Sequence, residues 1–165
     1  MTKLPAGGVG SFVKHKIRYS GTSDDGIVYD RSPDARLGIY YYESGAYPRL
    51  PAVTYDRAHS SFCSFRHAEV PAELLEKIRV LHVSGITLAL DPDLRADVME
   101  LMHKLKKSGT VISFDVNYRA ALWDEATARE VISSILPIVD ILFISEETLR
   151  RMFAQTGSLR EIHRS

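Results

Sequence analysis

The stretch TVISFDVNYR, residues 110–119, decides the fold of this chain. Its first half, residues 110–114, is a short and nearly continuous apolar run, which is typical of a strand buried in a parallel sheet. Its second half, from Asp115 to Arg119, is polar and has no turn-forming glycine. A buried strand that runs straight into Asp, Asn and Arg predicts the carboxyl edge of an α/β sheet, where ligands bind.

Strands and helices alternate on both sides of this stretch. Residues 79–84 (RVLHVS) and 140–144 (DILFI) are two further short apolar runs. Between the three runs, Asp91-Pro92 and Asp124 each begin a segment with helical periodicity. This order predicts an α/β fold with a parallel sheet, right-handed crossovers and helices on both faces.

The first seventy residues have a different pattern. They predict a helix over 10–19, a short strand over 27–29 and a turn at the glycine-rich residues 7–10, which follow no predicted strand and lack the Lys-Ser/Thr pair of a phosphate loop. Two β-type segments, RLGIYYY at 36–42 and AVTYDR at 52–57, flank a loop rich in glycine and proline. Together they predict a β-hairpin.

Composition restricts the class of partner. The 165 residues contain 21 Lys and Arg against 21 Asp and Glu. This balance argues against nucleic acid or a membrane surface as the partner, since both usually select a basic excess. The single cysteine, Cys63, excludes an internal disulfide, and no Cys/His cluster has zinc spacing. Because of this spacing we expect no metal site in this chain. No apolar stretch is long enough for a signal peptide or a membrane span, so we expect a cytoplasmic protein.

Two groups of residues are candidates for chemistry. The first follows the strands: Ser84-Gly85, residues 115–119 and residues 145–147 meet at one edge of the predicted sheet. The alternative is a capped loop in which Asp115 pairs with Arg119, and the pattern alone leaves both possibilities open.

The second group lies on the hairpin and contains Tyr40, Tyr55 and Arg57. Tyr55 and Arg57 are two residues apart in a strand, so their side chains point the same way. An arginine fork matches a carboxylate in a bidentate way, and tyrosine hydroxyls can orient it. The alternative is an aromatic face used for packing or for a dimer contact.

Five stretches together resemble the ribokinase-like (PfkB) carbohydrate kinases, most closely the 2-keto-3-deoxygluconate kinases (2-dehydro-3-deoxygluconokinases). They are RLGIYYYESG, AVTYDRAHSSF, LHVSGITLALDP, VISFDVNYRAALW and VDILFISEE, which begin at residues 36, 52, 81, 111 and 139. The run DVNYRAALW is shared with fructokinases, whereas the Tyr-x-Arg of YDRAHSSF points to the ketodeoxygluconate branch. The resemblance implies a three-layer α/β/α domain with a mainly parallel sheet and a small β lid.

The resemblance also implies roles for residues. It assigns the hairpin, about residues 36–57, to the lid that closes over the sugar and forms a homodimer interface, and residues 71–153 to the parallel α/β part. Tyr40 and Tyr55 would contact the sugar acid, and Arg57 would bind its carboxylate. Arg119 would lie between the sugar acid and the nucleotide phosphates, with Ser145 as a further cofactor contact. ATP and Mg²⁺ are the implied cofactors.

The chain departs from the family pattern in several places. No Gly-x-Gly-Asp occurs in it, so the motif that supplies the catalytic base and the anion hole is absent, as is the Gly-Gly…Asn sugar motif. His59 and Ser61 stand where the family usually has Gly and Ala, and Thr148 stands where an acidic residue often helps organise magnesium. We therefore expect residues 1–165 to be a partial kinase domain, from the N-terminal and middle portion, that binds ATP and Mg²⁺ poorly.

Three functions remain open. The first is a piece of a kinase that transfers the γ-phosphate of ATP to the 6-hydroxyl of 2-keto-3-deoxygluconate, inactive by itself because phosphoryl transfer depends on positioning and electrostatics that the missing motifs supply. The second is a piece of a fructokinase-like enzyme, although fructose has no carboxylate for Arg57. The third is a non-catalytic remnant that binds a sugar acid or dimerises.

Overall fold

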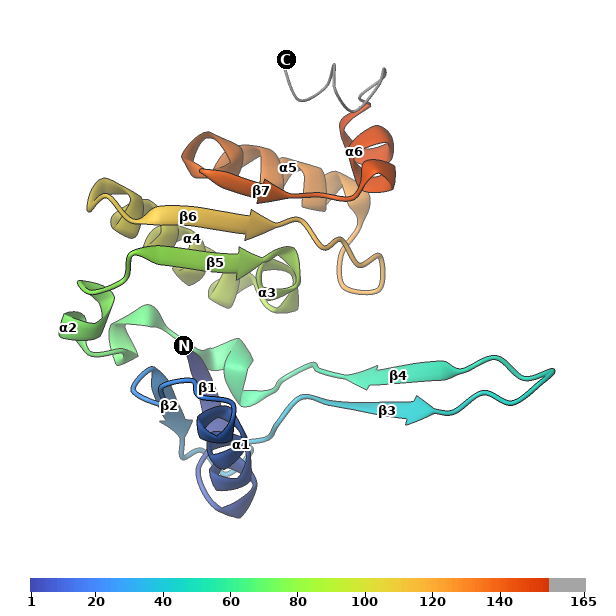
Figure 1. Cartoon of the computed structure of the whole chain (residues 1–165), viewed down its shortest axis with the longest axis horizontal. Helices are drawn as coiled ribbons and strands as arrows, with labels where there is room; N and C mark the ends of the chain where they lie inside the picture. Colours follow the sequence, from blue (N-terminus) through green and yellow to red (C-terminus); the bar gives the residue numbers. More distant parts are fainter. Residues whose placement is uncertain (155–165) are drawn as a thin grey trace. The chain divides into compact units, whose positions relative to one another are not determined.

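The computed structural model describes residues 1–154, which divide into two compact units, the first ending at Lys77 and the second beginning at Ile78 (Figure 1). Residues 155–165, the end of the expected partial kinase domain, lie outside the described residues.

The first unit begins with a β-α-β arrangement. Strand β1 (Thr2–Pro5) and strand β2 (Ile27–Asp30) are parallel neighbours, with Thr2 opposite Ile27, and helix α1 (Gly8–Tyr19) connects them. The predicted helix and the short strand near residue 27 are confirmed. The sequence pattern missed β1 because Lys3 and Pro5 interrupt its apolar character within only four residues.

The prediction of a turn at residues 7–10 is wrong. Only Gly7 has the positive φ, 114°, of a turn residue, and it precedes the helix, whereas Gly8 to Gly10 are the first helical residues of α1. Gly10 is required by close packing, because a Cβ there would lie 1.9 Å from the carbonyl oxygen of Pro5. Gly10 therefore allows α1 to pack closely against the end of β1.

The predicted hairpin is confirmed. Strands β3 (Ile39–Glu43) and β4 (Ala52–Asp56) are antiparallel, and Figure 1 shows them extending away from β1 and β2. We call β3 and β4 the aromatic hairpin, since four of its ten strand residues are tyrosines. Its role as a lid stays a prediction. After it come three short helical segments, Ser61–Ser64, His67–Glu69 and α2 (Ala72–Leu75).

The second unit is the predicted parallel α/β arrangement. Its strands are β5 (Val80–Ser84), β6 (Val111–Asp115) and β7 (Ile141–Phe143), all parallel and in the order β5-β6-β7. Its helices are α3 (Gly85–Leu90), α4 (Pro92–Lys107), α5 (Glu125–Ile135), the 3₁₀ turn Leu136–Ile138 and α6 (Glu146–Phe153). The strands and the helices that begin at Asp91 and Asp124 are confirmed. Helix α3 was not predicted, because six residues are too few to show a helical period.

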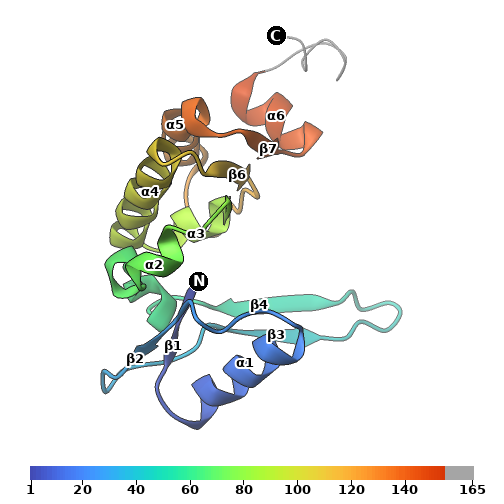
Figure 2. The same cartoon turned by 60° about the vertical axis from the view of Figure 1, so that its left-hand side comes forward.

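Helices α4 and α5 pack on the same face of this sheet (Figure 2). Right-handed crossovers through strands that follow one another in one direction place both helices on one side. The buried core lies there; it contains Leu81, Val83, Ile112, Phe114, Leu94, Val98, Leu101, Met102, Leu105, Ala128, Ile132 and Ile135. Alternate residues of β5 are exposed, among them Val80 at 56%. Within this unit, α4 and α5 therefore cover the face of the sheet that carries this core.

Across residues 1–154, the structure has no helix with the length and apolar character needed to cross a bilayer.

Candidate functional site

Three of the predicted site residues meet on the aromatic hairpin. Tyr40 lies directly opposite Tyr55 in the antiparallel register, and their ring centroids are 6.2 Å apart at an interplanar angle of 49°. The guanidinium carbon of Arg57 lies 3.9 Å from the centroid of the Tyr55 ring, which is cation–π distance. The structure therefore joins two tyrosines and one arginine into a single stack on one face of the hairpin.

This stack is accessible. Tyr40 is 63% and Tyr55 is 55% exposed, and Arg57 is half-buried. Strand geometry adds Tyr42 and Val53 to the same face, since they form the register pair that follows Tyr40 and Tyr55. Sequence reasoning had not selected Tyr42, although its spacing from Tyr40 is the signal that could have found it. The face offers one cation and several phenolic hydroxyls, a set of groups that can bind a carboxylate.

The strand ends of the second unit form a separate polar edge. Ser84 ends β5, and its hydroxyl oxygen accepts hydrogen bonds from the Ile86 amide at 3.3 Å and from the side-chain amide of Asn117 at 3.2 Å. Asn117 has a φ of 36°, in the left-handed region that asparagine tolerates. A Cβ on Gly85 would lie 2.0 Å from the carbonyl oxygen of Val116. These contacts fix the end of β6 against the end of β5.

Arg119 stands in the exposed part of this edge. It donates a hydrogen bond from Nη1 to the Tyr118 carbonyl oxygen at 2.8 Å. Within the described part of the chain, no ion pair joins it to Asp115, so the alternative of a loop closed by that pair is not what the structure has. The residue as a whole is exposed.

Ser145 begins α6 as its N-cap. Its hydroxyl oxygen accepts the Thr148 amide at 3.2 Å and donates to the Thr148 hydroxyl at 2.8 Å. The same closed pair occupies the side chain of Thr148, the residue at the position where the resemblance implies an acidic side chain. Ser145 is therefore exposed at a helix N-terminus, where the helix dipole favours an anion, while its hydroxyl is used within the helix.

Arg151 ties α6 to the loop that carries Arg119, a link that the sequence did not reveal. Its Nε lies 3.0 Å from Oε2 of Glu125, and its guanidinium carbon lies 5.3 Å from the Tyr118 ring centroid. The neighbouring N-cap of α5, Asp124, binds Thr127; its pKa is lowered by the hydrogen bond from the Thr127 hydroxyl and by the backbone amide. Helix α6 thus contacts both the loop after β6, at Tyr118, and the start of α5, at Glu125.

Among the described residues 1–154, the structure assigns no ligands to Mg²⁺. Among residues 1–154, no three His, Cys, Asp or Glu side chains converge so that they could hold a cation. Thr148 has no carboxylate to offer, and its hydroxyl is paired with Ser145.

The predicted site residues belong to two groups. Tyr40, Tyr55 and Arg57 lie together in the first unit, and Arg119 and Ser145 follow the adjacent strands β6 and β7 of the second. The second unit is a parallel α/β sheet with a polar carboxyl edge, and the same chain carries a protruding aromatic hairpin. Together these features are those of part of a ribokinase-like α/β protein of the sugar-kinase class. The chain belongs to the pfkB family of carbohydrate kinases, whose family model matches residues 1–164.

Known relatives agree with this. The chain is 35% identical over 157 residues to 2-dehydro-3-deoxygalactonokinase of Haloferax volcanii, covering 95% of the chain and 48% of the relative. It is 32% identical over 134 residues to fructokinase-1 of Oryza sativa, covering 81% and 40%. The crystal structure of 2-dehydro-3-deoxygluconokinase from Thermotoga maritima superposes with a TM-score of 0.86 at 31% identity, covering 99% of the chain and 50% of that structure. The predicted ribokinase-like fold class is confirmed, and the chain spans about half the length of these relatives.

Proposed function

We propose that this chain is the sugar-acid-binding part of a kinase that transfers the γ-phosphate of ATP to the 6-hydroxyl of 2-keto-3-deoxygluconate. The observation that carries the proposal is the stack of Tyr40, Tyr55 and Arg57 on one face of the aromatic hairpin. A guanidinium fixed on an aromatic ring, with a second tyrosine beside it, suits a carboxylate that must be bound in one orientation. The similarity to a ketodeoxygalactonate kinase and a ketodeoxygluconate kinase supports the same substrate class.

The strand ends supply the second half of the proposal. Arg119 would neutralise negative charge on the nucleotide phosphates, and the N-terminus of α6 at Ser145 would add backbone N–H groups. Electrostatic stabilisation of the phosphates is the main requirement of phosphoryl transfer. The sequence contains no Gly-x-Gly-Asp, so removal of the hydroxyl proton is assigned to no residue of this chain. We expect no ATP-dependent turnover by residues 1–165 alone, and robust phosphorylation of the acid would contradict that.

Calorimetric titration with 2-keto-3-deoxygluconate tests the hairpin site. Replacing Arg57 by Ala removes a charge-assisted pair, so affinity should fall by about ten- to a hundredfold. Arg49→Ala is the matched control, because Arg49 lies at the hairpin tip and donates to the Ser44 carbonyl oxygen at 3.1 Å. Equal affinity of the parent chain and the Arg57→Ala variant would remove Arg57 from the site and refute the proposal.

A fructose-specific kinase is the second candidate, favoured by the similarity to rice fructokinase-1. The two candidates differ in the carboxylate, which fructose lacks. We expect the chain to bind 2-keto-3-deoxygluconate and its 4-epimer, 2-keto-3-deoxygalactonate, more tightly than fructose. Tighter binding of fructose, unaffected by Arg57→Ala, would favour the second candidate. On either reading the expected location is the cytoplasm, where ATP is available.

We also propose that the kinase forms a homodimer through the aromatic hairpin. The support is the face opposite Tyr40 and Tyr55, where Ile39 is 46% and Tyr41 is 59% exposed. Exposed apolar side chains clustered on one strand face mark protein contacts.

A further inference from the structure

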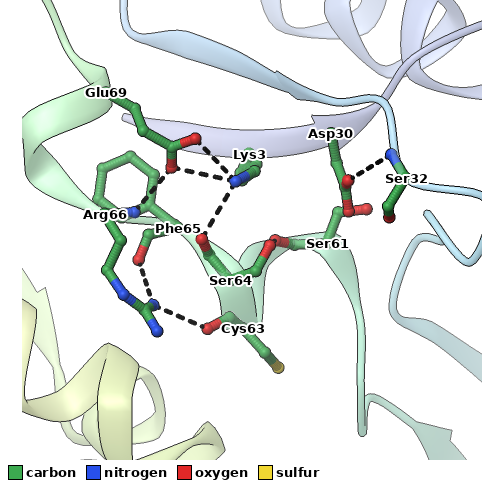
Figure 3. Close-up of polar contacts among 9 residues, drawn as sticks. All are labelled: Lys3, Asp30, Ser32, Ser61, Cys63, Ser64, Phe65, Arg66 and Glu69. Atoms are coloured by element: carbon green, nitrogen blue, oxygen red, sulfur yellow. Dashed lines mark hydrogen bonds and ion pairs between the residues drawn. The ribbon is translucent and has the colours of Figure 1, made fainter.

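A cluster of polar contacts fixes the segment that follows the aromatic hairpin (Figure 3). Lys3, on β1, is 12% exposed and donates from Nζ to the Ser64 carbonyl oxygen at 3.1 Å and to Glu69 at 2.8 Å. Glu69 also accepts the backbone amide of Arg66 at 3.0 Å. Residues 61–69 are thus attached to β1 and form a fixed base for the hairpin.

Arg36 joins the start of the hairpin to this base. Its backbone N–H donates to the Ser61 hydroxyl oxygen at 3.1 Å, and the Ser61 amide donates to the Arg36 carbonyl oxygen at 2.8 Å. Ser61 is 3% exposed, and its hydroxyl also contacts Asp30, the last residue of β2. The backbone of Arg36 is therefore fixed to Ser61, in the segment 61–69 that is attached to β1.

The side chain of Arg36 reaches the other strand. Its Nη1 donates to the Ala58 carbonyl oxygen at 3.1 Å, and its Nη2 forms a short ion pair with Oδ2 of Asp56. Asp56 and Ala58 are the two neighbours of Arg57 in the sequence. Strand alternation directs the Asp56 side chain to the face opposite Tyr55. The guanidinium of Arg36 therefore binds the residue before Arg57 and the residue after it, from the face opposite Tyr55.

We propose that Arg36 is a positioning residue that aims Arg57 at its ligand. With residues 56 and 58 held, the backbone of Arg57 has little freedom, and its side chain lies over the Tyr55 ring instead of sampling many rotamers. Pre-ordering an arginine in this way reduces the conformational entropy lost on binding. The inference rests on the proposed function for its purpose, whereas the coupling between Arg36 and Arg57 is a property of the free chain.

NMR of the free chain tests that coupling directly. A guanidinium stacked on a tyrosine ring gives ring-current shifts of the Arg57 side-chain protons and cross-relaxation with the Tyr55 ring protons. We expect Arg36→Met to remove both signals and Arg36→Lys, which keeps the charge but not the fork, to weaken them. Arg49→Met is the matched control at the hairpin tip and should leave both signals unchanged.

Cross-strand contacts between Tyr40 and Tyr55, together with Tm, show whether the hairpin is folded in each variant. Should Arg36→Met unfold it, Asp56→Asn provides the test, since it removes one of the two groups that Arg36 holds. Unchanged Arg57 shifts in a folded Arg36→Met or Asp56→Asn variant would overturn the inference.

Titration of the same variants with 2-keto-3-deoxygluconate separates this inference from the proposed function. We expect Arg36→Met to weaken binding by about three- to tenfold, less than Arg57→Ala does. If Arg57→Ala leaves affinity unchanged while Arg36→Met still removes the Arg57 shifts, the proposed function fails and the positioning role of Arg36 stands. If Arg57→Ala weakens binding and Arg36→Met changes neither affinity nor shifts, the reverse holds.

Discussion

Arg57 lies with its guanidinium carbon 3.9 Å above the ring of Tyr55, the residue two positions before it on the same strand face. The contact keeps a cation accessible at the surface of the aromatic hairpin while restricting its direction. An arginine side chain ordered on a ring loses fewer conformations when a ligand binds than a solvated arginine does.

The geometry of Arg57 predicts that a positive charge alone is not sufficient for full affinity toward the sugar acid. Arg57→Lys keeps the positive charge but loses the planar fork, so we expect affinity for 2-keto-3-deoxygluconate to fall by roughly tenfold in calorimetric titration. Tyr55→Phe keeps the ring and removes one hydroxyl, and should cost about three- to tenfold. Full affinity of Arg57→Lys would show that the fork is not used.

His59 is strained, which predicts a stabilising substitution. It is exposed and has a φ of 54°, in the left-handed region that costs a non-glycine residue roughly 1 kcal/mol. We expect His59→Gly to raise the free energy of unfolding by about 0.5–1 kcal/mol after the entropy of glycine in the unfolded chain is included. His103→Gly, in the exposed interior of α4, is the control and should destabilise by about 1 kcal/mol. Chemical denaturation measures both, and a less stable His59→Gly variant would contradict the prediction.

The close packing of Gly85 predicts that one added methyl group strongly destabilises the fold. Its Cβ would meet the Val116 carbonyl oxygen at 2.0 Å, so Gly85→Ala must displace backbone and should cost roughly 1–3 kcal/mol or more. Gly8→Ala, in the first turn of α1 with no atom within 4 Å of the added Cβ, should stabilise by up to about 1 kcal/mol. Thermal unfolding of the two variants gives the comparison. A neutral Gly85→Ala would mean that the close contact relaxes at no cost.

Asp140 predicts a pH dependence of stability. Its carboxylate pairs with Lys106 and accepts the Ile112 amide at 2.8 Å, and these two hydrogen bonds lower its pKa from the ordinary value of 3.8. A carboxyl whose pKa is lowered by folding stabilises the fold above its unfolded pKa, and this stabilisation is lost as pH falls through the folded value. The Tm of Asp140→Asn should lie below that of the parent chain at pH 7, and the gap should close below about pH 4.

Lys106→Met tests the same ion pair by removing the lysine that pairs with Asp140. Removing the lysine should move the carboxyl pKa back toward its ordinary value, so the pH dependence should weaken in that background. A constant gap between the parent chain and Asp140→Asn from pH 7 to pH 3 would show that the carboxylate does not contribute in this way.

The hairpin dimer predicts a specific pattern of self-association. Light scattering should show that Tyr41→Asp, on the face opposite Tyr55, shifts the chain toward monomer, because the added charge would be buried in the contact. Phe143→Asp is the comparison, since β7 is an edge strand of the sheet in residues 1–154, and its exposed apolar side chains offer a second route to association. If only Phe143→Asp reduces association, the contact is the sheet edge and the hairpin dimer is wrong.

Much of the fold could be predicted because its signals are local. The apolar runs near residues 80, 111 and 141 and the capping residues Asp91 and Asp124 each depend on a few neighbouring side chains. Strand β1 was missed because Lys3 and Pro5 interrupt its apolar character, and helix α3 because six residues are too few for a helical period to appear.

For the candidate site, the sequence by itself determined that Tyr55 and Arg57 share one face of a strand, since they are two residues apart. Only the tertiary structure decided that Tyr40 lies opposite Tyr55 and that Arg36 holds both neighbours of Arg57. The physical reason is register: pairing between segments some twenty residues apart is fixed by hydrogen bonds and packing across the hairpin, to which no short stretch of sequence gives a signal.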